Sequence, residues 1–244
     1  MERHEYLYGS MNIKVSESIS NILVSDCIRF GFIKNGEANF SGFINDIIPK
    51  LSKLREEKHN ELLKYNNSNE TITRIVEKNI YNVYLKEFDL EDDNTEIISF
   101  RINKKNKDDF IYIDDNMLEV YNMDFTNYIR SLLKEYSIKS TIKRELCYYS
   151  DILKDLNKAI KLNQLIKVYG NNEYMFVPIV LEQAHKKDCN YLVGIDESRE
   201  NILLIPLCEI KHISFLNKNI IIGDETVKSV AEYVYQVLNE EDDF

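Results

Sequence analysis

Histidine and cysteine, the residues that most often bind metal ions or act as nucleophiles, are few and scattered in this chain of 244 residues. There is no C-x-x-C pair, and the histidines are equally dispersed; the eight residues are His4, His59, His185, His212, Cys27, Cys147, Cys189 and Cys208. Cysteines spaced in this way are typical of buried thiols in a reducing compartment. The sequence therefore predicts no metal site, no disulfide framework and no cofactor.

Motifs of the common enzyme classes are missing as well. The sequence contains no G-x-S-x-G, P-loop, G-x-G-x-x-G or H-E-x-x-H motif. The acidic pairs Asp108-Asp109 and Asp114-Asp115 fall at or within a predicted surface helix, where acids commonly face solvent or compensate the helix dipole. We therefore expect a protein that is not an enzyme.

The net charge of −10 bears on which partners the chain can bind. Two segments carry most of the excess, because residues 65–94 hold three Lys/Arg against seven Asp/Glu and residues 217–244 hold two against seven. The remainder is balanced, so it can present a basic face, although its non-specific affinity for a polyanion should be weak. There is no apolar run of about 18 residues and no apolar stretch near Met1, so we expect a cytoplasmic protein without a membrane partner.

Two segments place polar and basic residues at every second position of a predicted strand. In residues 11–16 these residues are Asn12, Lys14 and Ser16, and in residues 98–103 they are Ser99, Arg101 and Asn103. Such alternation is typical of a strand with one buried face and one solvent face. The second segment continues into Lys104 and Lys105, which add positive charge.

Each of these strands precedes two stretches with helical spacing. The predicted helices cover residues 18–30 and 39–54 after the first strand, and residues 110–121 and 124–136 after the second. Pro49 should kink the helix that contains it or mark a boundary. Another helix is predicted over residues 71–90, with one apolar stripe formed by Ile72, Ile75, Val76, Ile80, Val83, Tyr84 and Phe88. The order strand, helix, helix thus occurs twice, which indicates an internal duplication.

The last third of the chain changes to short β-type runs. Five strands are predicted, over residues 165–169, 174–181, 191–195, 202–207 and 210–216, between a helix at 151–161 and a terminal helix at 227–238. Strands of this length and spacing suggest a small barrel or a curled sheet. The side chains expected to be mostly buried in it are Ile166, Val168, Val177, Ile179, Leu192, Leu204 and Ile210.

Residues 122–136, behind the strand of residues 97–103, resemble the second helix of a ribbon-helix-helix protein, and residues 11–54 resemble a more diverged copy of the same unit. We expect residues 11–16 to pair antiparallel with residues 97–103, since each strand alone would be marginal. The resemblance implies that such paired strands enter the major groove while helix N-termini hold phosphates. The nucleic-acid-binding residues would then be Asn12, Lys14, Ser99, Arg101, Asn103, Lys104 and Lys105. The alternative is a solvated strand face on a dimerisation module.

Residues 156–213 resemble a WYL domain, a small Sm/SH3-like barrel of bacterial regulators, through residues 159–160, 166–169, 177–179, 190–194 and 208–210. Asn190 stands where the family name has Trp. The resemblance implies a pocket for nucleic acid or another anion, formed here by Tyr169, His185, Tyr191 and Arg199. Pro206 and Glu209 stand where the family usually has arginines, and a carboxylate there would repel phosphate. The alternative is that Tyr191 is a core aromatic and Arg199 a solvated loop residue.

The fold expected from these patterns is α+β: tandem ribbon-helix-helix-like units, then a WYL barrel with a C-terminal helix. The expected boundaries are 1–66 for the first unit, 67–95 for a linking helix and acidic linker, 96–148 for the second unit, 149–216 for the barrel, and 217–244 for the final strand, helix and acidic tail. This order resembles that of the WYL accessory proteins of type VI-D CRISPR systems, which bind RNA and stimulate an RNA-guided RNase.

We therefore expect a non-catalytic regulator that binds nucleic acid, with single-stranded RNA or DNA, a CRISPR effector protein and a second copy of the chain as candidate partners. The alternative is a protein-interaction module with an acidic surface that does not itself bind nucleic acid.

Overall fold

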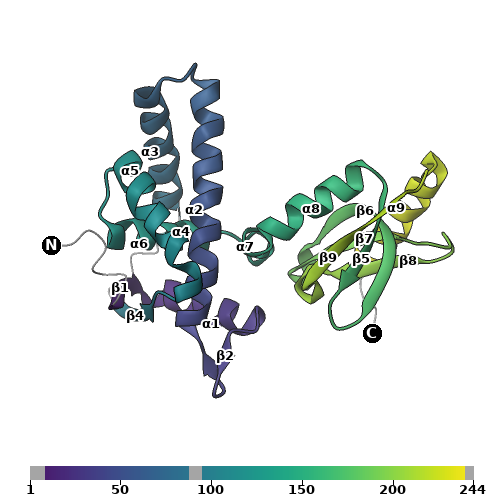
Figure 1. Cartoon of the computed structure of the whole chain (residues 1–244), viewed down its shortest axis with the longest axis horizontal. Coiled ribbons are helices and arrows are strands. Elements are labelled where there is room, and N and C mark those ends of the chain that lie inside the picture. Colours follow the sequence, from purple (N-terminus) through teal and green to yellow (C-terminus); the bar gives the residue numbers. More distant parts are fainter. Residues whose placement is uncertain (1–8, 88–94, 240–244) are drawn as a thin grey trace. The chain divides into compact units, whose positions relative to one another are not determined.

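The structure, a computed structural model, describes residues 9–87 and 95–239 and divides the chain into two compact units, residues 1–139 and 140–244. The predicted acidic linker at residues 91–93 and the acidic tail at residues 240–243 lie outside the described residues. Helix and strand are mixed in both units (Figure 1), so the expected α+β class is confirmed at that level. In the part of the chain that the structure describes, no helix is both long and apolar enough to span a membrane.

The first unit is built on a two-stranded antiparallel ribbon. Its elements are β1 (Ser10–Ser16), α1 (Glu17–Arg29), β2 (Ile33–Lys34), β3 (Glu37–Ala38), α2 (Phe40–Tyr65), α3 (Glu70–Glu87), β4 (Thr95–Arg101), η2 (Lys104–Asn106), α4 (Lys107–Tyr112), η3 (Ile113–Met117), α5 (Leu118–Tyr121) and α6 (Phe125–Ser137). β1 pairs with β4 so that Met11 lies opposite Phe100 and Ile13 opposite Ile98, and all four side chains are buried. The pairing predicted from the two alternating segments is therefore confirmed within one chain.

Side-chain caps set where the main helices of this unit begin. The Asn39 side chain accepts a hydrogen bond from the backbone N–H of Gly42 at 3.0 Å, and Asp124 accepts one from Asn127 at 2.9 Å. α1 begins at Glu17, and its cap is Ser16, two residues before Ser18, the cap that the sequence suggests. A side-chain oxygen at this position satisfies a backbone donor that has no partner inside the helix.

Pro49 does not end a helix: α2 is 26 residues long, and Pro49 lies inside it. Proline has no N–H, so the carbonyl four residues earlier, that of Asn45, loses its helical donor. The side-chain amide of Asn106 donates to this Asn45 carbonyl instead. A side chain from η2 therefore replaces the missing bond, and the helix continues.

The apolar stripe predicted for α3 is only partly supported. Ile72 and Ile75 are 47% and 55% exposed, whereas Thr73 between them is buried. Thr73 accepts a hydrogen bond from the Asn66 side chain at 3.0 Å, so a polar contact anchors the start of this helix. The side chains of residues 80–87 and the predicted stripe member Phe88 lie outside the described part of the chain.

The second unit is an open sheet with a helix on each face, which corrects the expected barrel. Its elements are α7 (Thr141–Tyr148), α8 (Ser150–Lys161), β5 (Gln164–Tyr169), β6 (Glu173–Ala184), η4 (His185–Lys187), β7 (Cys189–Asp196), β8 (Ile202–Pro206), η5 (Leu207–Glu209), β9 (His212–Asn219) and α9 (Asp224–Asn239). The antiparallel sheet has the order β8-β7-β6-β5-β9, and among the described residues β8 and β9 do not pair to close it. Both edges therefore remain open (Figure 1).

Both faces of this sheet are apolar because each is covered. Leu156 and Ala159 of α8 pack with Ile166 and Leu192, whereas Val230 and Val234 of α9 pack on the opposite face. The strand core residues predicted from the sequence are buried at Ile166, Val168, Val177, Leu192 and Ile210 and half-buried at Ile179 and Leu204. A helix on each side explains why neighbouring residues in one strand are both buried.

Candidate nucleic-acid interface

The outward face of the β1–β4 ribbon carries four of the predicted binding residues. Asn12, Lys14, Ser99 and Arg101 are all exposed. Asn12 lies directly opposite Ser99, whose hydroxyl donates to the Asn12 amide oxygen at 2.6 Å. The centre of the face is therefore neutral and already hydrogen-bonded.

The two cations of the ribbon lie at its opposite ends. Lys14 is opposite Ile97, and Arg101 is opposite Ser10, so the two positions are four steps apart along the ladder. At about 3.3 Å per residue this separates them by roughly 13 Å along the strands. Such a pair can contact two different phosphates of one strand or one groove, rather than a single phosphate.

Asn103, Lys104 and Lys105 extend the Arg101 end of the ribbon, and all three are exposed. Asn45, buried in α2, positions this segment: its side-chain oxygen accepts from the Asn103 N–H at 2.7 Å, and its side-chain amide donates to the Arg101 carbonyl at 2.8 Å. Asn45 was not predicted from the sequence. The available signal was the polar pair Asn45-Asp46 inside the otherwise apolar run of residues 43–48.

Replacing Asn45 with alanine should lower the free energy of unfolding by about 1–3 kcal/mol, because the part-buried Asn103 N–H and Arg101 carbonyl would each lose a hydrogen bond to this side chain. Urea titration of the wild type and the variant measures the difference. Asn116→Ala is the matched control, since the Asn116 side chain is exposed and donates only to the Tyr112 carbonyl of its own helical turn. Equal stability of the two variants would contradict the anchoring role of Asn45.

Arg130 of α6 adds a cation that the sequence did not reveal. Its Nε donates to the Lys14 carbonyl at 2.8 Å, and its Nη1 donates to the Asn127 side chain at 2.6 Å. The guanidinium therefore lies at the Lys14 end of the ribbon, so each end of the face has more than one basic residue.

The helix N-termini of the two repeats differ in how they suit an anion. α2 is capped by the neutral Asn39 and has no acidic residue in its first turn. α6 is capped by the carboxylate of Asp124, which occupies the positive end of that helix and would repel a phosphate. If helix ends contribute to binding, the α2 end is the one suited to phosphate.

The four residues predicted to form a WYL pocket are not gathered in one place. His185 lies in η4 before β7, whereas Arg199 lies in the turn after β7, with a left-handed φ of +66°. The eight residues of β7 separate these turns by roughly 23 Å. Tyr169, at the end of β5, has its ring 5.7 Å from that of His212.

Tyr191 has surroundings of its own. It lies in β7 directly opposite Pro206, one of the positions where the family usually has arginine. Burial and the nearby Cys189, Cys208, Glu145 and Glu209 raise the pKa of its phenol. Anionic groups around this tyrosine argue against a phosphate pocket here.

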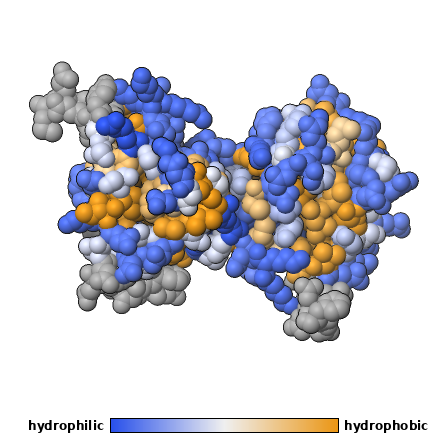
Figure 2. Space-filling view, turned by 90° about the horizontal axis from the view of Figure 1, so that it is seen from below, coloured by the Kyte–Doolittle hydropathy of each residue, from blue (hydrophilic) through white to orange (hydrophobic). Residues whose placement is uncertain are grey.

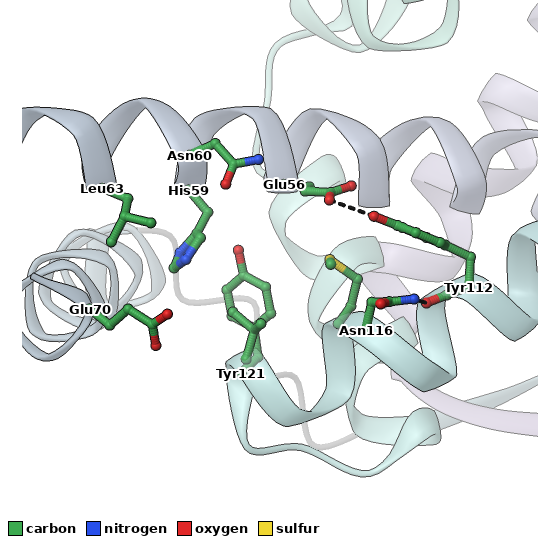
Figure 3. A pocket seen from close by; sticks show the side chains of 10 residues that line it. Glu56, His59, Asn60, Leu63, Glu70, Tyr112, Asn116 and Tyr121 are labelled. Atoms are coloured by element: carbon green, nitrogen blue, oxygen red, sulfur yellow. Dashed lines mark hydrogen bonds between the residues drawn. The ribbon is translucent and has the colours of Figure 1, made fainter. Parts of the chain in front are cut away.

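The first unit also contains a pocket of about 280 Å³ between α2 and the η3–α5 segment (Figure 3). It is lined by Glu56, His59, Asn60, Leu63, Glu70, Tyr112, Asn116, Met117, Val120 and Tyr121. The Tyr112 hydroxyl donates to Glu56 at 2.6 Å, and the His59 Nδ1 lies 3.0 Å from Glu77. Carboxylates in the wall make this pocket unsuited to phosphate, so the ribbon face remains the candidate interface.

Comparison with known proteins supports the fold. No protein-family model matches the chain, and no curated protein matches it. A solved structure described as "Crystal structure of a CRISPR Cas-related protein" is similar, with a TM-score of 0.61, 15% sequence identity, and coverage of 98% of this chain and 73% of that chain. At this identity the match bears on the fold.

Proposed function

We propose that the protein is a non-catalytic regulator that binds nucleic acid through the outward face of the β1–β4 ribbon. The observation that carries the proposal is a complete ribbon within one chain, with Lys14 and Arg101 exposed at its two ends. In the ribbon-helix-helix proteins that the sequence resembles, the same face of the ribbon contacts the nucleic acid. A second copy of the chain is not needed to build this ribbon, although a dimer would present two.

The proposed setting is a CRISPR system. The similar solved structure is described as CRISPR Cas-related, and the sequence resembles accessory proteins of type VI-D systems in its order of elements. On this proposal the nucleic acid is single-stranded RNA or DNA, and the protein modulates an RNA-guided RNase.

Binding should be weak and should depend on salt. With about three phosphate contacts, the logarithm of the affinity should fall with the logarithm of the salt concentration with a slope of about −2 for a single strand. Filter binding with single-stranded RNA, single-stranded DNA and duplex DNA over a salt series tests this expectation. If none of the three binds even at low salt, the proposal is wrong.

The competing function is a protein-interaction module. Apolar side chains break the hydrophilic surface of the first unit (Figure 2), and the exposed ones include Ile28, Ile33 and Ile97. Surface isoleucines of this kind favour a protein partner. An Ile97→Ser variant separates the two functions. It removes an apolar contact without adding charge, so it should weaken docking of a protein on the ribbon, whereas replacing Lys14 and Arg101 with alanine should weaken nucleic-acid binding.

A further inference from the structure

Two cysteines far apart in the sequence meet beside a buried glutamate in the second unit. The β7–β8 ladder ends with Tyr191 opposite Pro206; Cys189 lies at the start of β7, and Cys208 lies in η5, the turn that follows β8. Glu145 of α7 lies at the same point. One ligand atom from each of these residues, two sulfurs and one carboxylate oxygen, lies within 4.8 Å of the others.

The carboxylate of this cluster is held in a fixed orientation. Oε2 of Glu145 accepts hydrogen bonds from the backbone N–H of Asn190 at 2.7 Å and from its side-chain amide at 2.5 Å. The same amide donates to the Ile142 carbonyl at 3.0 Å, and both Asn190 and Glu145 are fully buried. Oε1 of the same carboxylate lies 3.9 Å from the thiol of Cys189, which also donates to the Asn190 carbonyl at 3.3 Å.

We propose that Cys189, Cys208 and Glu145 bind a Zn²⁺ ion. In tetrahedral zinc sites Zn–S is about 2.3 Å and Zn–O about 2.1 Å, which places the sulfur and oxygen roughly 3.6 Å apart. The distance of 3.9 Å between Cys189 Sγ and Glu145 Oε1 needs little adjustment to reach that value. Thiolate ligands favour Zn²⁺ over the hard cations Mg²⁺ and Ca²⁺.

The charge and exposure of the cluster also suit a dication. Binding releases one proton from each thiol and leaves two thiolates and a carboxylate around the ion. Cys208 is exposed, so a metal can reach the site, and a water molecule can complete its coordination. Asn190 acts as a positioning residue, since hydrogen-bond partners that orient a metal ligand commonly change metal affinity 10- to 100-fold.

The site would join three elements that carry no short metal motif. Helix α7, strand β7 and turn η5 each contribute one ligand, so the ion would fasten α7 to the β7–β8 hairpin. This arrangement explains why the spacing of the cysteines predicted no metal site: the fold of the second unit, rather than a local motif, brings Cys189 and Cys208 together.

The test is titration of the reduced full-length chain with Co²⁺ and Zn²⁺. We expect one ion per chain, the visible absorption of tetrahedral Co²⁺, a near-ultraviolet thiolate-to-cobalt band, and displacement of Co²⁺ by Zn²⁺. Cys208→Ser and Glu145→Gln should each weaken Zn²⁺ binding by about 100-fold or more. Each removes a direct ligand, and the loss of a direct ligand should cost at least as much affinity as the loss of a residue that only orients one. Cys147→Ser is the matched control, because Cys147 lies on α7 outside the cluster and its loss should leave binding unchanged.

Three results would overturn the proposal. The reduced chain could bind no Zn²⁺, or Cys208→Ser could bind it as tightly as the wild type. The third is that the reduced chain binds no metal and, after air oxidation, mass spectrometry maps a Cys189–Cys208 disulfide. The two cysteines would then be a redox couple. Circular dichroism of Cys208→Ser, whose changed side chain is exposed, separates loss of binding from loss of folding.

Discussion

Replacing Arg55 with alanine is expected to lower the free energy of unfolding by about 3 kcal/mol. Arg55 of α2 donates from Nε and Nη2 to one oxygen of Glu135 at 3.1 and 2.8 Å, and from Nη1 to the Ser131 hydroxyl at 2.7 Å. Its guanidinium also lies 5.4 Å from the ring centre of Tyr121 and 5.2 Å from that of Tyr128. Losing one partner of a buried ion pair typically costs 3–5 kcal/mol. The lower end of this range applies for two reasons. The Glu135 side chain is 28% exposed, and it would remain paired with Lys139, whose Nζ lies 3.6 Å from Oε1 of Glu135.

Urea unfolding followed by circular dichroism measures this loss. Arg74→Ala is the control, because Arg74 and Glu70 form an exposed pair one helical turn apart, worth only a few tenths of a kcal/mol. Arg55→Lys should recover part of the loss, since it keeps the charge but not the two-pronged contact. Equal effects at Arg55 and Arg74 would contradict a structural role for the buried network.

The same network makes stability depend on pH with a defined sign. Burial, the largest single effect, would raise the pKa of Glu135, but the charges of Arg55, Lys139 and Lys58 and the hydrogen bond from Arg55 together outweigh it, and the pKa is lowered. The stabilisation is therefore fully present above the unfolded value, near 4.3, and is lost as the pH falls through the lower folded value. In Glu135→Gln this acid-dependent part of the unfolding curve should disappear.

The ribbon could be predicted from the sequence because its signal is local. Alternation in residues 11–16 and 98–103 placed Ile13 and Ile98 inside and Lys14 and Arg101 outside, and the register confirms that arrangement. Polar caps such as Asn39 and Asp124 are also local signals, since each satisfies a backbone donor three residues away. Elements whose stability is decided by neighbouring residues are the ones that sequence analysis recovered.

Features that depend on distant contacts could not be predicted. The continuation of α2 through Pro49 depends on Asn106, which is 61 residues from its acceptor, Asn45. The open sheet was expected as a barrel because short strands at this spacing suit a barrel or a curled sheet, and because the sequence resembles a WYL domain. The strand order β8-β7-β6-β5-β9 and the packing of α9 on the face opposite α8 distinguish the two.

Replacing Lys14 and Arg101 together with alanine should weaken nucleic-acid binding by about 10- to 100-fold at a fixed salt concentration. Each is exposed at one end of the ribbon face, and each lost phosphate contact should reduce the salt slope by about one unit. The loss should be similar for every sequence if both residues contact phosphates. It should depend on sequence if Arg101 contacts a guanine edge, because that contact discriminates between bases.

Arg199→Ala is the matched comparison for this pair and should change the affinity little. Arg199 is exposed in the turn after β7, away from His185 at the other end of that strand. Alanine at this position keeps a Cβ on the same left-handed backbone, so the turn is not expected to change. Titrations of both variants at one salt concentration compare them directly. If Arg199→Ala abolishes binding while the ribbon double variant binds normally, the second unit contacts the nucleic acid and the ribbon is a scaffold.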